Sequence, residues 1–183
     1  MKEKTTEKRS FLWLNTTQFF GALNDNLFKL LMIFYLISVL GSEAAGEVSA
    51  ATGIAFVLPF LIFSPIAGMV ADRITKSKLI VAAKASEILV MAVGTLSLVT
   101  SSVVGLYVTL FLMALQSTFF SPAKYGIVPE LVSREGLSRA NGQLEAFTYL
   151  AIILGTTAAT TVPMITGGDY RLAGFATIVI AIA

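Results

Sequence analysis

The chain of 183 residues contains 56% hydrophobic and only 13% charged residues. This composition lies outside the range of soluble globular domains and predicts an integral membrane protein. Cysteine and histidine are both absent, which excludes a disulfide framework, a thiolate metal site and a histidine proton relay. Any proton coupling must therefore use carboxylates.

Six apolar segments, separated by short polar loops, are each predicted to form a membrane helix. They are residues 11–40, 50–71, 79–99, 103–125, 144–162 and 172–183. A helix of about 20 residues crosses the hydrocarbon core, whereas the last segment reaches only about 18 Å. It stops inside an apolar run, so we expect the natural chain to continue and the sixth helix to be truncated here.

Basic residues indicate the orientation in the membrane. They gather in the polar segment 1–10, in the loop between the second and third segments, and in the loop between the fourth and fifth. The intervening loops carry two glutamates or no charge, and Arg171 near the sixth segment is the exception. The positive-inside rule then predicts that residues 1–10 are a cytoplasmic N-terminal tail.

The first segment contains four polar residues within six positions: Asn24, Asp25, Asn26 and Lys29. Asp25 lies near the middle of the membrane, where an ionised carboxylate is costly and marks a functional site. Lys29 is four residues further on and shares a helix face with Asp25, so an ion pair that neutralises itself is the alternative. That pair would leave both asparagines unexplained.

The stretch GMVADRITKSK, which follows the second segment, contains Gly68, Asp72, Arg73 and Lys76. It resembles the signature of the major facilitator superfamily, G-x-L-x-D-R-x-G-R-K, with valine in place of leucine and threonine in place of the second glycine. The resemblance implies that Gly68 permits close helix packing and that the charged residues form exchangeable ion pairs during alternating access. A loop made basic only to fix the topology is the alternative.

The third segment carries Lys84 and Glu87 on one helix turn. One interpretation is a structural ion pair that lowers the cost of membrane insertion, and the other is a site on Glu87 for a coupling proton or sodium ion. Gln143 and Glu145, at the start of the fifth segment, are expected at the membrane interface. A position of Glu145 at the inner mouth of a cavity is the alternative.

The fourth segment contains Lys124, close to Pro122 and Pro129. A lysine this near the cytoplasmic end can snorkel to the surface, although prolines can kink or end the helix and redirect its side chain. QFFGALND in the first segment and STFFSPAK in the fourth both show Phe-Phe, then a small residue and an ionisable group. In inverted three-helix repeats the first and fourth helices correspond, which favours a shared path lined by Asp25 and Lys124.

The stretches TQFFGALNDNLFK, QSTFFSPAKYGIVPEL and SRANGQLEAFTYLAIILGT resemble the bacterial lysophospholipid transporter family of that superfamily. The resemblance covers residues 11–157. It implies an all-α membrane protein in which residues 11–183 are the N-terminal six-helix bundle of a major-facilitator fold, built from two inverted three-helix repeats. The stretch GTTAATT has one glycine where a richer pattern is expected, which leaves the packing around Gly155 open.

The resemblance also implies the substrate contacts. Asp25 and Lys124 are the leading candidates for the polar headgroup, with Asn24 and Asn26 beside Asp25. A carboxylate suits the ammonium of a zwitterionic lysolipid, and a lysine suits its phosphate. No cofactor and no metal are implied.

The function that follows is a flippase-like secondary transporter, which moves lysophospholipids such as lysophosphatidylethanolamine across the bacterial inner membrane for reacylation. Expected partners are this substrate, membrane lipids, the C-terminal transporter half, and an acyltransferase/acyl-carrier-protein ligase to which some family members are fused. The sequence contains no ATP-binding glycine-rich loop and, without histidine, no Ser-His arrangement, so we predict a transporter and no enzyme. The basic residues are accounted for by the loops, and no nucleic-acid partner is predicted.

Three alternatives remain compatible with these patterns. The first is a proton-coupled exporter or importer of another solute within the same superfamily. The second is the membrane portion of a longer acyltransferase polypeptide. The third is a scaffold or half-transporter that dimerises.

Overall fold

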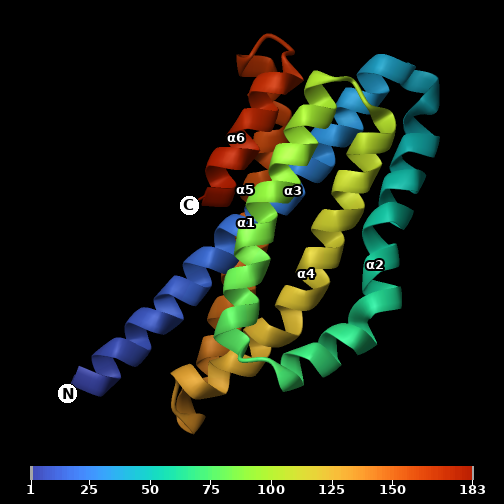
Figure 1. Cartoon of the computed structure of the whole chain (residues 1–183). Helices are drawn as coiled ribbons and strands as arrows, with labels where there is room; N and C mark the ends of the chain where they lie inside the picture. The colour runs from blue at the N-terminus through green and yellow to red at the C-terminus, as the bar shows by residue number, and fades with distance from the viewer. Residues whose placement is uncertain (1, 183) are drawn as a thin grey trace.

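The computed structural model describes residues 2–182, which form helices and no strand in that range. The α-helices are α1 (Lys2–Leu40), α2 (Ala45–Arg73), α3 (Lys76–Val99), α4 (Val103–Leu131), α5 (Leu137–Ile165) and α6 (Tyr170–Ile182). Short 3-10 turns, Ser42–Ala44 and Arg134–Gly136, precede α2 and α5. Figure 1 shows the helices side by side in one bundle. The predicted all-α membrane bundle is confirmed.

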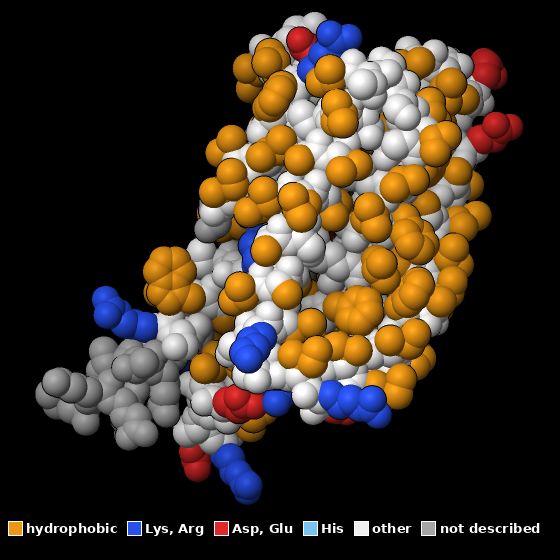
Figure 2. All heavy atoms as spheres, in the orientation of Figure 1, with side chains coloured by type: hydrophobic (Ala, Val, Ile, Leu, Met, Phe, Trp, Pro, Cys, Tyr) orange, Lys and Arg blue, Asp and Glu red, His pale blue; other side chains and the backbone are white. Residues whose placement is uncertain are grey.

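Five of these helices are long and apolar enough to cross a membrane. The sixth, α6, is apolar but contains only 13 residues, and the last residue of its predicted segment, residue 183, lies outside the described residues. Figure 2 shows hydrophobic side chains along the sides of the bundle, with charged side chains mostly near its two ends. This distribution suits a protein whose sides contact lipid and whose ends contact water.

Each helix lies where a segment was predicted, but several helices begin or end at other residues than predicted. Residues 2–10 of the predicted tail are already helical, and α1 continues through them without a break. α4 includes both Pro122 and Pro129 and ends only at Leu131. Prolines are tolerated within membrane helices because neighbouring groups satisfy the freed backbone carbonyls.

The packing of the helices repeats between the two halves of the chain. α1 packs along α5, and α4 packs along α2; α3 packs on α4, and α6 packs on α1. Exchanging the first three helices with the last three therefore reproduces the main contacts, with α3 and α6 packed against each other. This exchange is the contact pattern of two related three-helix repeats.

Two apolar clusters occupy opposite halves of the bundle. The larger contains Phe28 of α1, Met91 of α3 and Met113 of α4, all fully buried. The smaller contains Leu14 of α1, Ile127 of α4 and other residues near the α4–α5 connection. Residues 15–27 of α1 and 114–126 of α4 therefore lie between the clusters, and these are the segments that carry the predicted site.

Glycines report how closely the helices approach one another. A Cβ atom at Gly155 of α5 would lie 2.4 Å from the backbone oxygen of Leu23, so α1 and α5 pack tightly through this glycine. At Gly68 a Cβ atom would meet nothing within 4 Å. None of the described helices makes the close contact that we predicted at Gly68, because this residue lies on a face of α2 that they leave open.

Candidate functional site

A cavity of about 200 Å³ lies inside the bundle, at the level between the two apolar clusters. Most of its wall comes from α1 and α4, and α3 adds Lys84 and Glu87. Single side chains from α2 and α5, Phe60 and Thr148, complete the described part of the wall. The cavity is therefore polar and charged at a depth where the surrounding bundle surface is apolar.

α1 and α4 use the same helix face to line this cavity. The residues from α1 are Thr17, Gln18, Gly21, Ala22 and Asp25, and those from α4 are Gln116, Ser117, Phe120, Ser121 and Lys124. Each residue number in the second set exceeds its counterpart in the first by 99, since 124 − 25 = 99 and the other four pairs differ equally. Asp25 and Lys124 are thus opposite charges at matching positions of two corresponding helices.

Asp25 is held by α4 rather than by its own helix. The Ser117 hydroxyl donates a hydrogen bond to Asp25 Oδ2 at 2.8 Å. Lys29 instead donates to Asn26 Oδ1 at 3.3 Å and lies 4.7 Å from the centroid of the Phe56 ring. Among the described residues no ion pair joins Asp25 to Lys29, so the alternative of a self-neutralising pair is wrong.

Glu87 is the centre of a second polar group, which forms part of the cavity wall. Its side chain is 1% exposed, and Lys84 Nζ lies 2.7 Å from its Oε2 atom. Asn24, which is fully buried, donates to Glu87 Oε1 at 3.2 Å. The structural ion pair is therefore formed, and Asn24 satisfies the second oxygen of a carboxylate that is costly to bury unpaired.

Lys124 remains inside the bundle. It is 8% exposed, and its Nζ atom lies 4.3 Å from the centroid of the Tyr125 ring, within range of a cation–π interaction. The Tyr125 hydroxyl hydrogen-bonds to Glu145 Oε1 on α5. Lys124 therefore does not snorkel to the surface, and Glu145 binds the hydroxyl of Tyr125 instead of lining the cavity.

Only two of the four predicted substrate contacts line the cavity. Asp25 and Lys124 do so, whereas Asn24 lies behind the wall against Glu87. Asn26 donates to the Ala22 carbonyl of its own helix at 2.8 Å, and its Cβ lies 3.3 Å from the position that a Cβ of Gly155 would take. Asn26 is therefore directed toward α5 and supports the α1–α5 contact.

Sequence reasoning missed several neutral polar residues of the wall. Gln18 Nε2 donates to the Leu144 carbonyl at 3.0 Å and contacts the Thr148 hydroxyl, which joins α1 to α5. The Oε1 atoms of Gln18 and Gln116 are buried and have no hydrogen-bond partner among the described residues. The signal was present in the sequence, because Gln18 precedes Asp25 by seven positions, or two helix turns, on the same face.

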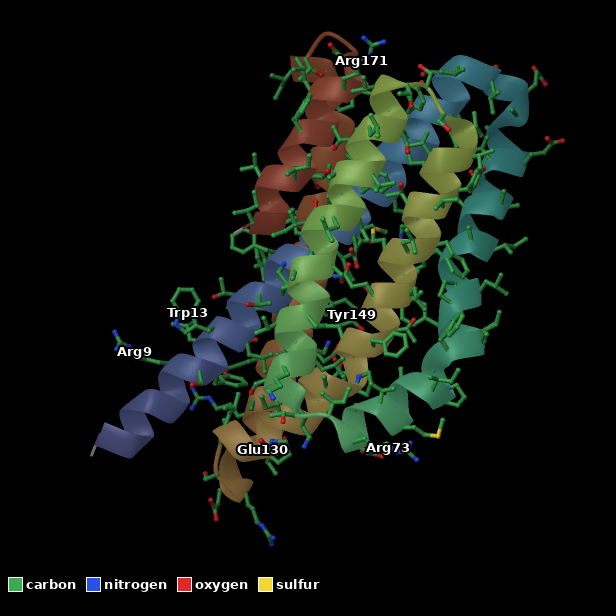
Figure 3. All side chains as sticks on the ribbon, in the orientation of Figure 1. Arg9, Trp13, Arg73, Glu130, Tyr149 and Arg171 are labelled. Atoms are coloured by element: carbon green, nitrogen blue, oxygen red, sulfur yellow. The ribbon has the colours of Figure 1, made fainter. Side chains whose placement is uncertain are left out.

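The signature loop makes one ion pair in the described range. Lys76 Nζ lies 2.9 Å from Glu130 Oε1, which links the start of α3 to the end of α4. Asp72 and Arg73 are exposed and form no ion pair within residues 2–182. Figure 3 shows Arg73 and Glu130 at one end of the bundle and Arg171 at the other. Glu130 was not predicted as the partner of Lys76.

A multi-pass helical bundle with opposite charges around an internal polar cavity is the architecture of a membrane transporter. The chain is 30% identical over 162 residues to the lysophospholipid transporter LplT of Yersinia pestis (strain Pestoides F), and equally so to that of Yersinia pseudotuberculosis serotype O:3 (strain YPIII). This similarity supports assignment of the chain to the lysophospholipid transporter family of the major facilitator superfamily.

The matches cover 86% of this chain, and the chain spans 37% of the length of these relatives. No family model and no solved structure matches the sequence. The names of the relatives indicate a transporter.

Proposed function

We propose that the protein is a flippase-like secondary transporter that moves lysophospholipids, such as lysophosphatidylethanolamine, across the bacterial inner membrane toward the cytoplasm. The observation that carries this proposal is the pair of opposite charges, Asp25 and Lys124, at matching positions around one cavity. The names of the relatives support the substrate class.

The chemistry of the cavity suits a zwitterionic headgroup. The Asp25 carboxylate binds the ammonium, and the Lys124 ammonium binds the phosphate, each through a charge-assisted hydrogen bond. Ser117 orients the carboxylate and Tyr125 supports the lysine. Charges at membrane depth are costly when they lack a partner, so a ligand that supplies both opposite charges is favoured over water or an uncharged solute.

The proposed orientation places the N-terminus and the Lys76–Glu130 ion pair at the cytoplasmic side. There the pair joins α3 to α4, and its formation and rupture accompany alternating access. A C-terminal half completes the substrate path, and an acyltransferase/acyl-carrier-protein ligase reacylates the delivered lysolipid. These partners are the ones that the resemblance of the sequence to the family implies.

The test is uptake of radiolabelled lysophosphatidylethanolamine by proteoliposomes that contain the full-length protein. Asp25→Asn removes the charge and keeps the shape, so uptake should be lost while membrane insertion stays normal. Asp169→Asn is the matched control, because Asp169 is an exposed carboxylate near α6 and lies outside the cavity wall. Wild-type uptake by Asp25→Asn would refute the role of this cavity.

A further inference from the structure

An apolar groove of about 320 Å³ lies next to the polar cavity, on a neighbouring face of α3 and α4. It is lined by residues between positions 79 and 90 of α3 and between positions 112 and 119 of α4, nearly all of them apolar. Lys84 and Glu87 face the cavity, whereas Ala82 and Ser86 of the same helix turns face the groove. The α3–α4 seam therefore separates a polar site from an apolar one.

α3 and α4 run side by side (Figure 1), and they contact each other closely beyond both ends of the groove. Beyond one end, a Cβ atom at Gly94 would lie 2.8 Å from Thr109 Cγ2. Beyond the other end, a Cβ atom at Gly126 would lie 3.0 Å from Lys76 Cε, beside the Lys76–Glu130 ion pair. The groove lies between these two contacts, at the level of the cavity.

Gln116 is the one residue that lines both the cavity and the groove in the described structure. Its Oε1 atom is shielded from solvent and accepts no hydrogen bond from any described residue. A buried acceptor without a donor is unfavourable, so a ligand that brings a donor to this point gains more than the same contact would give in water. This position suits a ligand that has a polar end, an apolar end and a hydrogen-bond donor between them.

We propose that Gln116 accepts a hydrogen bond from the free glycerol hydroxyl of a single-chain phospholipid whose headgroup occupies the polar cavity and whose acyl chain lies in the α3–α4 groove. This inference rests on the proposed function and names the residue that distinguishes lysolipids from two-chain lipids. In a two-chain phospholipid the hydroxyl is esterified, so the donor is lost.

The first experiment removes the hydroxyl from the ligand. Wild-type full-length protein in proteoliposomes takes up 1-acyl lysophosphatidylethanolamine, and its analogue with hydrogen in place of the glycerol hydroxyl is the competitor. Loss of one hydrogen bond to a buried acceptor should weaken binding of the analogue about fivefold. This comparison needs no substitution in the protein.

The second experiment removes the acceptor. In Gln116→Leu the two ligands should compete equally, because neither can form the hydrogen bond. Ser121→Ala is the control, since Ser121 lines the cavity but not the groove, and this variant should keep the fivefold difference. A third experiment tests the site of the acyl chain. Ala82→Phe should fill the groove and raise the half-saturating lysolipid concentration several-fold. Ala85→Phe, on an exposed face outside both sites, should leave that concentration unchanged.

The outcomes separate the inference from the proposed function. Saturable uptake with equal affinity for the hydroxyl and deoxy ligands would overturn the role of Gln116 and leave the transporter proposal standing. Retention of the difference in Gln116→Leu, or equal effects of Ala82→Phe and Ala85→Phe, would also overturn it. No saturable uptake of lysophosphatidylethanolamine by the wild type would refute the proposed function itself.

Discussion

Replacement of Gly155 by alanine should weaken the contact between α1 and α5. The added Cβ atom would lie 2.4 Å from the Leu23 carbonyl oxygen, whereas ordinary contact begins near 3.4 Å, so the two helices must separate by about 1 Å. The clash is with backbone, which cannot rotate away, and we assign it about 3 kcal/mol from the upper range of overpacking costs. Alanine regains about 1 kcal/mol of helix propensity, which leaves a net loss of about 2 kcal/mol.

Gly142→Ala is the matched control for this prediction. Gly142 lies in the same helix and is exposed, and a Cβ atom there would meet nothing within 4 Å. This variant should be as stable as the wild type or more stable by up to about 1 kcal/mol. Thermal unfolding of both purified proteins in detergent gives the comparison. Equal melting temperatures for Gly155→Ala and Gly142→Ala would show that α1 and α5 do not pack through Gly155.

Three further predictions concern the charged residues. Lys124→Gln should abolish lysolipid uptake, whereas Lys124→Arg should retain part of it; equal activities in the uptake assay would argue against a role for the charge. Glu87→Leu should destabilise the protein by about 3 kcal/mol in the same thermal assay, since Lys84 loses its partner, and Lys84→Met in addition should restore most of that loss. Asp72→Ala should change the uptake rate more than the half-saturating concentration, and a change in affinity alone would contradict a conformational role.

The helices could be predicted from the sequence because the bilayer fixes how long an apolar run must be. Their ends could not, since prolines that would break a helix in water are tolerated in α4. Asp25 was predicted as a site residue because charge at membrane depth is costly, whereas Lys124 was predicted from the family resemblance and from its place in the corresponding helix. The pairing of helices required the structure.

The direction in which a side chain points from its helix was harder to predict than whether the residue belongs to the polar group. Neighbours on a helix are about 100° apart, so Asn24 and Asn26 cannot both share the face of Asp25. One contacts Glu87 on α3 and the other points toward α5. The ion pair between Lys76 and Glu130 was not predicted because the two residues lie 54 positions apart in the sequence. Gln116 escaped notice because a single neutral amide in an apolar helix carries no charge signal.

The most direct test of the account is to ask whether a lysolipid occupies the cavity. Residues 1–183 contain no cysteine, so Ser121→Cys introduces a single thiol into the wall of the cavity, in a full-length protein with any other cysteines replaced by serine. Ser77→Cys, on an exposed turn at the start of α3, is the control. Saturating lysophosphatidylethanolamine should protect the first thiol from a small maleimide and leave the second reactive. Equal labelling of Ser121→Cys with and without the lysolipid would contradict the central claim.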